Sequence, residues 1–289
     1  MTSLLEQKII SMPTRRIFNW RAFGFLVGLY FVGNLAGIPL LMVSDMPVEP
    51  VEAWLLATAI SAVLIGIGLF LASRTGLGAP LIEGQLSKAE TPDWLRTVIA
   101  ISILTAIVGS LIALLLPGSF NPNPERYPES WRLILASIKA GIVEEIFSRL
   151  IMVSLFAWLG SRVSRRADGR PSRLVLWTAI ILAGLMFGWA HVVDNLSIPG
   201  ATLEMLTSIF SLNATFGILF GWFFWKFGLE CAMLAHFLVD AIFSTLVVPA
   251  YLSEDPLVWI GVGSGLIIAG LISWHVLTGT RLGVKPSTT

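Results

Sequence analysis

The chain has 289 residues, of which 55% are hydrophobic and only 13% are charged. An average soluble domain carries about 25% charged residues, so this composition excludes an ordinary soluble domain and predicts a membrane protein with several spans. The 19 basic residues nearly balance the 18 acidic ones, and no basic tract indicates a nucleic-acid partner.

Eight apolar windows, each long enough to cross a bilayer core about 30 Å thick, follow one another along the chain. Continuous apolar runs predict helices, whereas the strands of a β-barrel would be short and alternating. We therefore predict an all-α fold, a polytopic membrane helical bundle of about eight transmembrane helices with short loops. The predicted spans are 22–43, 53–72, 97–116, 131–160, 174–193, 206–225, 229–248 and 257–277.

The distribution of basic residues predicts the orientation, because Lys and Arg are retained on the cytoplasmic side. Most of the 19 fall on one side of the eight-span arrangement, including the cluster at residues 162–173 and Lys226. The sequence thus predicts a multi-pass protein of the cell membrane, surrounded by lipid, with both termini cytoplasmic.

Four ionisable or polar groups in the fourth span require an explanation, because a charge inside a membrane costs at least about 2.5 kcal/mol. Glu145 and Arg149 are four residues apart and lie on one helix face, which predicts an ion pair. Glu144 is turned about 100° away and has no opposite charge one turn along. Its partner is expected on another helix or in water.

Two further spans carry histidines. Phe187 and His191 are four residues apart in the fifth span, and His236 and Asp240 are four apart in the seventh, so each pair shares a helix face. Together with Glu144, these spans contain four groups capable of proton transfer or metal binding. They predict a polar intramembrane site.

Glu144, His191 and His236 lie at similar depths in the membrane only under one condition. Counted from the inner ends of their spans, Glu144 and His191 each lie about 27 Å along the helix. His236 follows Lys226 by ten residues, about 15 Å. We therefore expect the connection at 226–230 to be a recessed hairpin, since otherwise His236 cannot reach Glu144.

The three motifs, in this order on separate spans, resemble the signature motifs of the CPBP family of intramembrane proteases and bacteriocin-processing or immunity proteins, which includes the CAAX prenyl endopeptidases. The resemblance covers about residues 139–243. It implies an intramembrane endopeptidase acting on a peptide or protein substrate near the membrane. The motifs are Glu144-Glu145-x-x-x-Arg149, Phe187-x-x-x-His191 and His236-x-x-x-Asp240.

By position, the resemblance implies that Glu144 and His191 activate a water, while His236 with Asp240 polarises the substrate carbonyl. Asp240 departs from the commonest form of the family, which has Asn, because an ionised Asp can only accept hydrogen bonds. The side chains that the resemblance gives a supporting role are Glu145, Arg149 and Phe187.

The resemblance allows two kinds of protease. In one, the Glu144 carboxylate is the base; in the other, Glu144, His191 and His236 bind one zinc ion that activates the water. The sequence is compatible with both, so the cofactor is either none or one zinc.

Two functions of other classes use the same residues. A non-catalytic immunity or scaffold protein that retains the site is favoured by Asp240, and a proton-coupled carrier by the carboxylates and histidines. The predicted domain organisation is a cytoplasmic segment at 1–21, the first three spans at 22–130, the protease-like core at 131–248 and the last span with its tail at 249–289.

Overall fold

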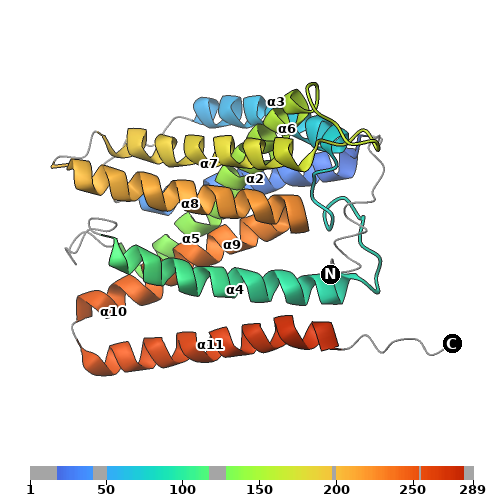
Figure 1. Ribbon diagram of the computed structural model, residues 1–289. Helices are drawn as coiled ribbons and strands as arrows, with labels where there is room; N and C mark the ends of the chain where they lie inside the picture. Colours follow the sequence, from blue (N-terminus) through green and yellow to red (C-terminus); the bar gives the residue numbers. More distant parts are fainter. Residues whose placement is uncertain (1–17, 42–50, 117–127, 197–199, 254, 283–289) are drawn as a thin grey trace.

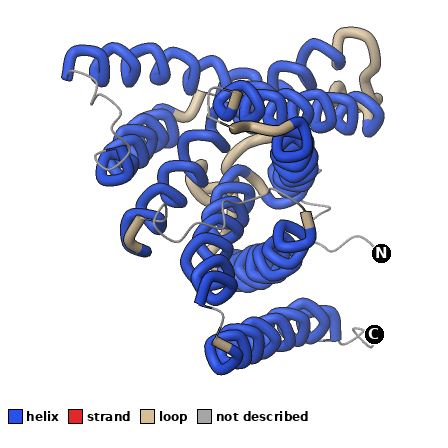
Figure 2. The backbone as a smooth tube through the Cα atoms, turned by 90° about the vertical axis from the view of Figure 1, so that its left-hand side faces the viewer, coloured by secondary structure: helices blue, strands red, loops and turns tan. Residues whose placement is uncertain are grey.

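The computed structural model describes residues 18–41, 51–116, 128–196, 200–253 and 255–282. Within these ranges the fold is all-helical (Figure 2), and one isolated β-bridge joins Arg165 to Pro171. The predicted all-α class is confirmed. The helices are α2 (Trp20–Leu41), α3 (Val51–Thr75), α4 (Thr91–Leu115), α5 (Ser130–Lys139), η2 (Ala140–Glu144), η3 (Ile146–Val153), α6 (Ser154–Gly160), α7 (Arg173–Asn195), α8 (Leu203–Phe227), α9 (Leu229–Ile242), η4 (Phe243–Val247), α10 (Val248–Ser253) and α11 (Pro256–Leu282).

In the described ranges, seven helices are long and apolar enough to cross a membrane. The remaining predicted span, the fourth at 131–160, is a continuous helical run but not one α-helix, because it is divided into α5, η2, η3 and α6. Its middle is π-helical, with wider turns than an α-helix, at the residues that include Glu144 and Arg149. π-helical turns are frequent at functional sites, where they redirect side chains.

Glycines allow α7 and α8 to lie against each other, antiparallel, as Figure 1 shows. Gly184 and Gly188 are one turn apart in α7, as are Gly217 and Gly221 in α8. A Cβ atom at Gly217 would lie only 2.8 Å from the Cα atom of Gly184. Because small residues are required for such close packing of helices, these glycines determine where α7 and α8 place their functional side chains.

The connection between α8 and α9 is buried under the loop that joins α3 to α4. Gly228 makes the turn with a positive φ of 98°, and the Leu229 N–H donates to the carbonyl of Gly78 at 3.0 Å. Oε1 of Glu230 accepts from the backbone N–H groups of residues 81 and 82, at 2.9 and 2.8 Å. The hairpin is thus covered by another part of the chain, while its depth in a membrane stays a prediction.

The outer helices complete the bundle. α11 packs on α4 and lies at the edge of the bundle in both views (Figures 1 and 2), with only 6% of its apolar window buried. The start of α2 is tied to the loop after α3, where the Asn19 amide donates to the carbonyl of Glu83 at 3.2 Å. Figure 1 shows the start of α2 and the end of α11 at the same end of the bundle, which agrees with an even number of crossings.

Candidate active site

Three helical segments distant in sequence bring the four predicted reactive groups together. Oε2 of Glu144, at the end of η2, lies 3.7 Å from Nε2 of His191 in α7 and 4.0 Å from Nε2 of His236 in α9. Asp240, one turn after His236, has Oδ2 at 3.5 Å from the same Nε2. The structure therefore groups these side chains, while their chemical roles stay a prediction.

The position of Phe187 determines which nitrogen of His191 faces the site. Nδ1 of His191 lies 2.9 Å from the backbone carbonyl of Phe187. A carbonyl can only accept, so Nδ1–H donates, and the neutral ring presents the lone pair of Nε2 toward Glu144. The Phe187 ring also contacts both histidines, with centroid distances of 4.5 Å to His191 and 5.8 Å to His236.

A second carboxylate, that of Glu145, contacts the other ring nitrogen of His236. Glu145 and Arg149 form the predicted ion pair, with 3.0 Å between Oε2 and Nε, and both side chains are fully buried. The other oxygen of Glu145 accepts from Nδ1 of His236 at 2.8 Å. Sequence reasoning missed this contact, because the one-turn spacing reveals the Glu145–Arg149 pair but not which helix packs against it.

Aromatic rings enclose the buried cation. The guanidinium carbon of Arg149 lies 4.9 Å from the ring centroid of Phe187 and 5.8 Å from that of Phe220. Phe220, in α8, also stacks on His236 with 5.0 Å between ring centroids. Sequence reasoning did not select Phe220, because nothing in the pattern of α8 distinguishes it from the other phenylalanines of that helix.

The acidic and basic side chains of the site differ in their exposure. The side chains of Glu145 and Arg149 are 0% exposed, whereas those of Glu144 and Asp240 are 34% and 39% exposed. Oε2 of Glu144 has no hydrogen-bond partner among the described residues. Its separations from the two histidine nitrogens are too long for direct hydrogen bonds and suit a shared water molecule.

The predicted zinc alternative stays a prediction, because no ligand set for it is assembled in the part of the chain that the structure describes. Among the described residues, no group of three or more His, Cys, Asp or Glu is arranged to hold a metal ion. Adjacent ligand atoms around tetrahedral zinc are roughly 3.3 Å apart, while Glu144 is 3.7 and 4.0 Å from the two histidine nitrogens. The residue types suit zinc, while these distances are longer than those around a bound ion, so the roles below are derived from the side chains alone.

Residues 127–242 match a family model described as Type II CAAX prenyl endopeptidase Rce1-like. The matched segment contains all three motifs, from Glu144 to Asp240, so this part of the chain is similar to the protease family that the motifs indicated. The family supports a protease, and the seven apolar helices fit a multi-pass membrane protein. No curated protein and no solved structure matches the chain.

Proposed function

We propose that this protein is an intramembrane endopeptidase that hydrolyses a peptide bond in a peptide or protein close to the membrane. The observation that carries the proposal is the convergence of the Glu144 carboxylate with Nε2 of His191 and of His236 at 3.7 and 4.0 Å. These groups come from three helices of the segment that matches a protease family.

Glu144 acts as the general base in this proposal. A water between Glu144 and His191 transfers its proton to the carboxylate as its oxygen attacks the substrate carbonyl, and the lone pair of His191 Nε2 helps to hold it. The proton then passes from Glu144 to the leaving amine, so the step is balanced. A positioned base of this kind typically contributes about 10²–10⁴ in rate.

His236 stabilises the oxyanion that develops on the attacked carbonyl. When its ring carries both protons, Nδ1–H donates to Glu145 and Nε2–H donates toward the substrate oxygen. Before substrate binds, Oδ2 of Asp240 lies 3.5 Å from Nε2 of His236 and attracts it electrostatically. In this assignment Asp240 orients His236, and His236 is the donor.

The proposal is tested by comparing membrane-proximal protein termini, by quantitative mass spectrometry, in cells that produce the wild type or Glu144→Ala. We expect a set of new termini with the wild type alone. Asp93→Ala is the matched control, because Asp93 is an exposed acid outside the site that pairs with Arg96. Termini that persist in Glu144→Ala contradict the proposal. The sequences at the new termini would also show whether prenylated C-terminal ends are substrates.

A non-catalytic immunity or scaffold function is the second candidate, favoured by Asp240 in place of the family's common Asn. Under this function Glu144→Gln, which keeps the size of the side chain, would still complement a strain lacking the protein. Under the protease proposal the same variant fails to complement, so one assay separates the two candidates.

A further inference from the structure

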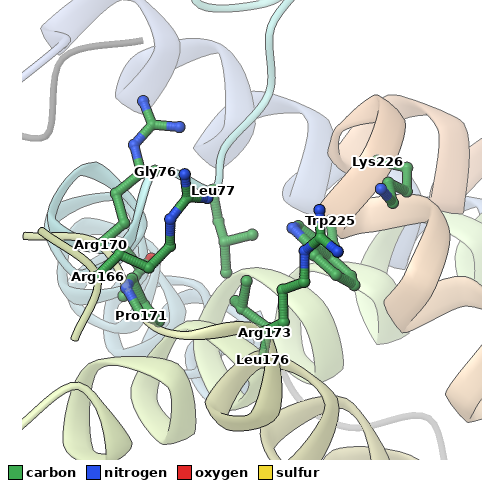
Figure 3. A pocket seen from close by; sticks show the side chains of 10 residues that line it. Gly76, Leu77, Arg166, Arg170, Pro171, Arg173, Leu176, Trp225 and Lys226 are labelled. Atoms are coloured by element: carbon green, nitrogen blue, oxygen red, sulfur yellow. The ribbon is translucent and has the colours of Figure 1, made fainter. Parts of the chain in front are cut away.

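A pocket outside the candidate active site opens at the end of the bundle where α3 and α8 end and α7 begins (Figure 3). Its cavity volume is about 50 Å³, and it is partly open to the surroundings. We call it the basic pocket, because four of its ten lining residues are cationic and none of the ten is acidic. The cationic residues are Arg166, Arg170, Arg173 and Lys226.

A folded turn positions the arginines of the basic pocket. The β-bridge between Arg165 and Pro171 closes the turn, and the Arg166 N–H donates to the carbonyl of Arg170 at 2.8 Å. Arg170 is only 7% exposed and packs against Gly76, where an added Cβ atom would lie 3.4 Å from the guanidinium carbon. The Arg166 side chain pairs with Asp168 of the same turn at 3.3 Å, with both side chains exposed. Arginine suits an anion with several oxygen atoms, because a guanidinium group binds phosphate with two parallel hydrogen bonds.

Tryptophans indicate that the basic pocket lies at the level of lipid headgroups. Trp225 lines it, Nζ of Lys226 lies 4.6 Å from the Trp225 ring centroid, and Trp177 of α7 contacts Trp225 at 5.8 Å. Tryptophan is enriched at the boundary between membrane and water.

An apolar face of α7 leads away from the basic pocket. Leu174, Trp177, Ile181 and Leu185 recur at helical spacing and are 75%, 40%, 42% and 41% exposed. Residues three and four apart share a helix face, so they form one continuous apolar surface beside the pocket. A cationic pocket next to such a surface matches the two parts of a phospholipid.

We propose that the basic pocket binds the phosphate of an anionic phospholipid, whose acyl chain lies along the apolar face of α7. The shared chemistry is a phosphate group, which free inorganic phosphate would also supply. The Trp177–Trp225 contact and the adjoining apolar face favour the lipid as its source. This inference concerns a separate site and does not depend on the proposed protease activity.

The test is native mass spectrometry of the purified full-length protein in detergent, titrated with phosphatidylglycerol or phosphatidylcholine. The pocket variant carries Arg166→Gln, Arg173→Gln and Lys226→Gln, and Arg170 is kept because its buried side chain packs on Gly76. The control variant removes the same number of charges outside the pocket, at Arg74, Arg96 and Arg162, whose side chains contact Phe70, Asp93 and Trp158.

We expect the wild type and the control variant to retain one phosphatidylglycerol in preference to phosphatidylcholine. Each cation near a charged lipid surface contributes on the order of fivefold in affinity, so the pocket variant should bind at least about tenfold more weakly. Equal weakening in both variants, or no weakening in the pocket variant, overturns the proposal.

Two further measurements address binding of free phosphate and the case in which the triple variant does not fold. Inorganic phosphate that displaces the lipid completely at equal concentration would show a site for free phosphate and overturn the lipid assignment. The single variant Arg166→Gln, on the exposed side of the turn, serves if the triple variant does not fold, and it should lose affinity about fivefold. An unchanged affinity in a folded Arg166→Gln also contradicts the proposal.

Discussion

Oε1 of Glu145 lies 2.8 Å from Nδ1 of His236, while Oε2 of the same carboxylate lies 3.0 Å from Nε of Arg149. One buried carboxylate therefore joins α9 to η3 and holds the histidine that faces Glu144. The adjacent acids Glu144 and Glu145 consequently have different surroundings: the side chain of the first is 34% exposed and lies beside two histidines, and the second is fully buried in an ion pair.

Glu145→Gln should destabilise the fold strongly, because it leaves the fully buried charge of Arg149 without a counter-ion. Removing one partner of a buried pair typically costs about 3–5 kcal/mol. The measurement is thermal unfolding of the purified protein in detergent. The double variant Glu145→Gln/Arg149→Met removes both charges and should recover most of the lost stability. A double variant no more stable than Glu145→Gln would show that the ion pair is not the reason.

Asp240→Asn should retain cleavage of a substrate identified from the new termini, because an amide oxygen can still accept from Nε2 of His236. Asp240→Leu removes that acceptor and should lower kcat by about 10–100-fold, as expected for a residue that positions another. KM should change little in Asp240→Leu. Equal loss in both variants would show instead that the negative charge of Asp240 is required.

Gly217→Ala should lower the thermal midpoint, because the added Cβ atom would lie 2.8 Å from the Cα atom of Gly184 and force α7 from α8. Overpacking of this kind costs about 1–3 kcal/mol. Gly263→Ala in α11 is the control, since no atom lies within 4 Å of its added Cβ. If both substitutions had the same effect, the close contact of α7 with α8 would not be what requires glycine.

Glu230→Ala should loosen the loop between α3 and α4, because it removes the acceptor for the backbone N–H groups of Leu81 and Ile82. Hydrogen–deuterium exchange of the peptide containing these amides should become faster, while exchange in α11 stays unchanged. Glu230→Gln keeps a carbonyl acceptor and should protect the loop nearly as well as the wild type. Unchanged exchange in Glu230→Ala would show that Glu230 does not hold the loop.

Metal removal should leave cleavage intact, because in the proposed mechanism the Glu144 carboxylate itself activates the water. The measurement is activity after dialysis against a strong chelator, together with elemental analysis of the purified protein. His236→Ala is analysed beside it, since loss of a ligand would lower metal content. One zinc per chain, lost in His236→Ala, would favour the metal-dependent mechanism instead.

Local patterns were sufficient for the helical class and most helix positions. Apolar length predicted spans at 174–193 and 206–225, and the structure has α7 at Arg173–Asn195 and α8 at Leu203–Phe227. The predicted span at 131–160 is helical throughout, but its π-turns could not be predicted, because hydrophobic length does not show where hydrogen bonding widens. The outer part of the predicted first span, 42–43, lies outside the described residues.

Helical periodicity alone was enough to place Glu145 with Arg149, and His236 with Asp240, on common faces, because these pairs depend only on the turn of one helix. The contacts of Glu145 with His236 and of Phe220 with His236 emerge only when α8, α9 and η3 are packed together. The distances from Glu144 to the two histidines also depend on this packing, and so does the contact of the loop after α3 with Gly228. A sequence pattern specifies which face of a helix is polar, whereas the close approach permitted by Gly184 and Gly217 determines which neighbour that face meets.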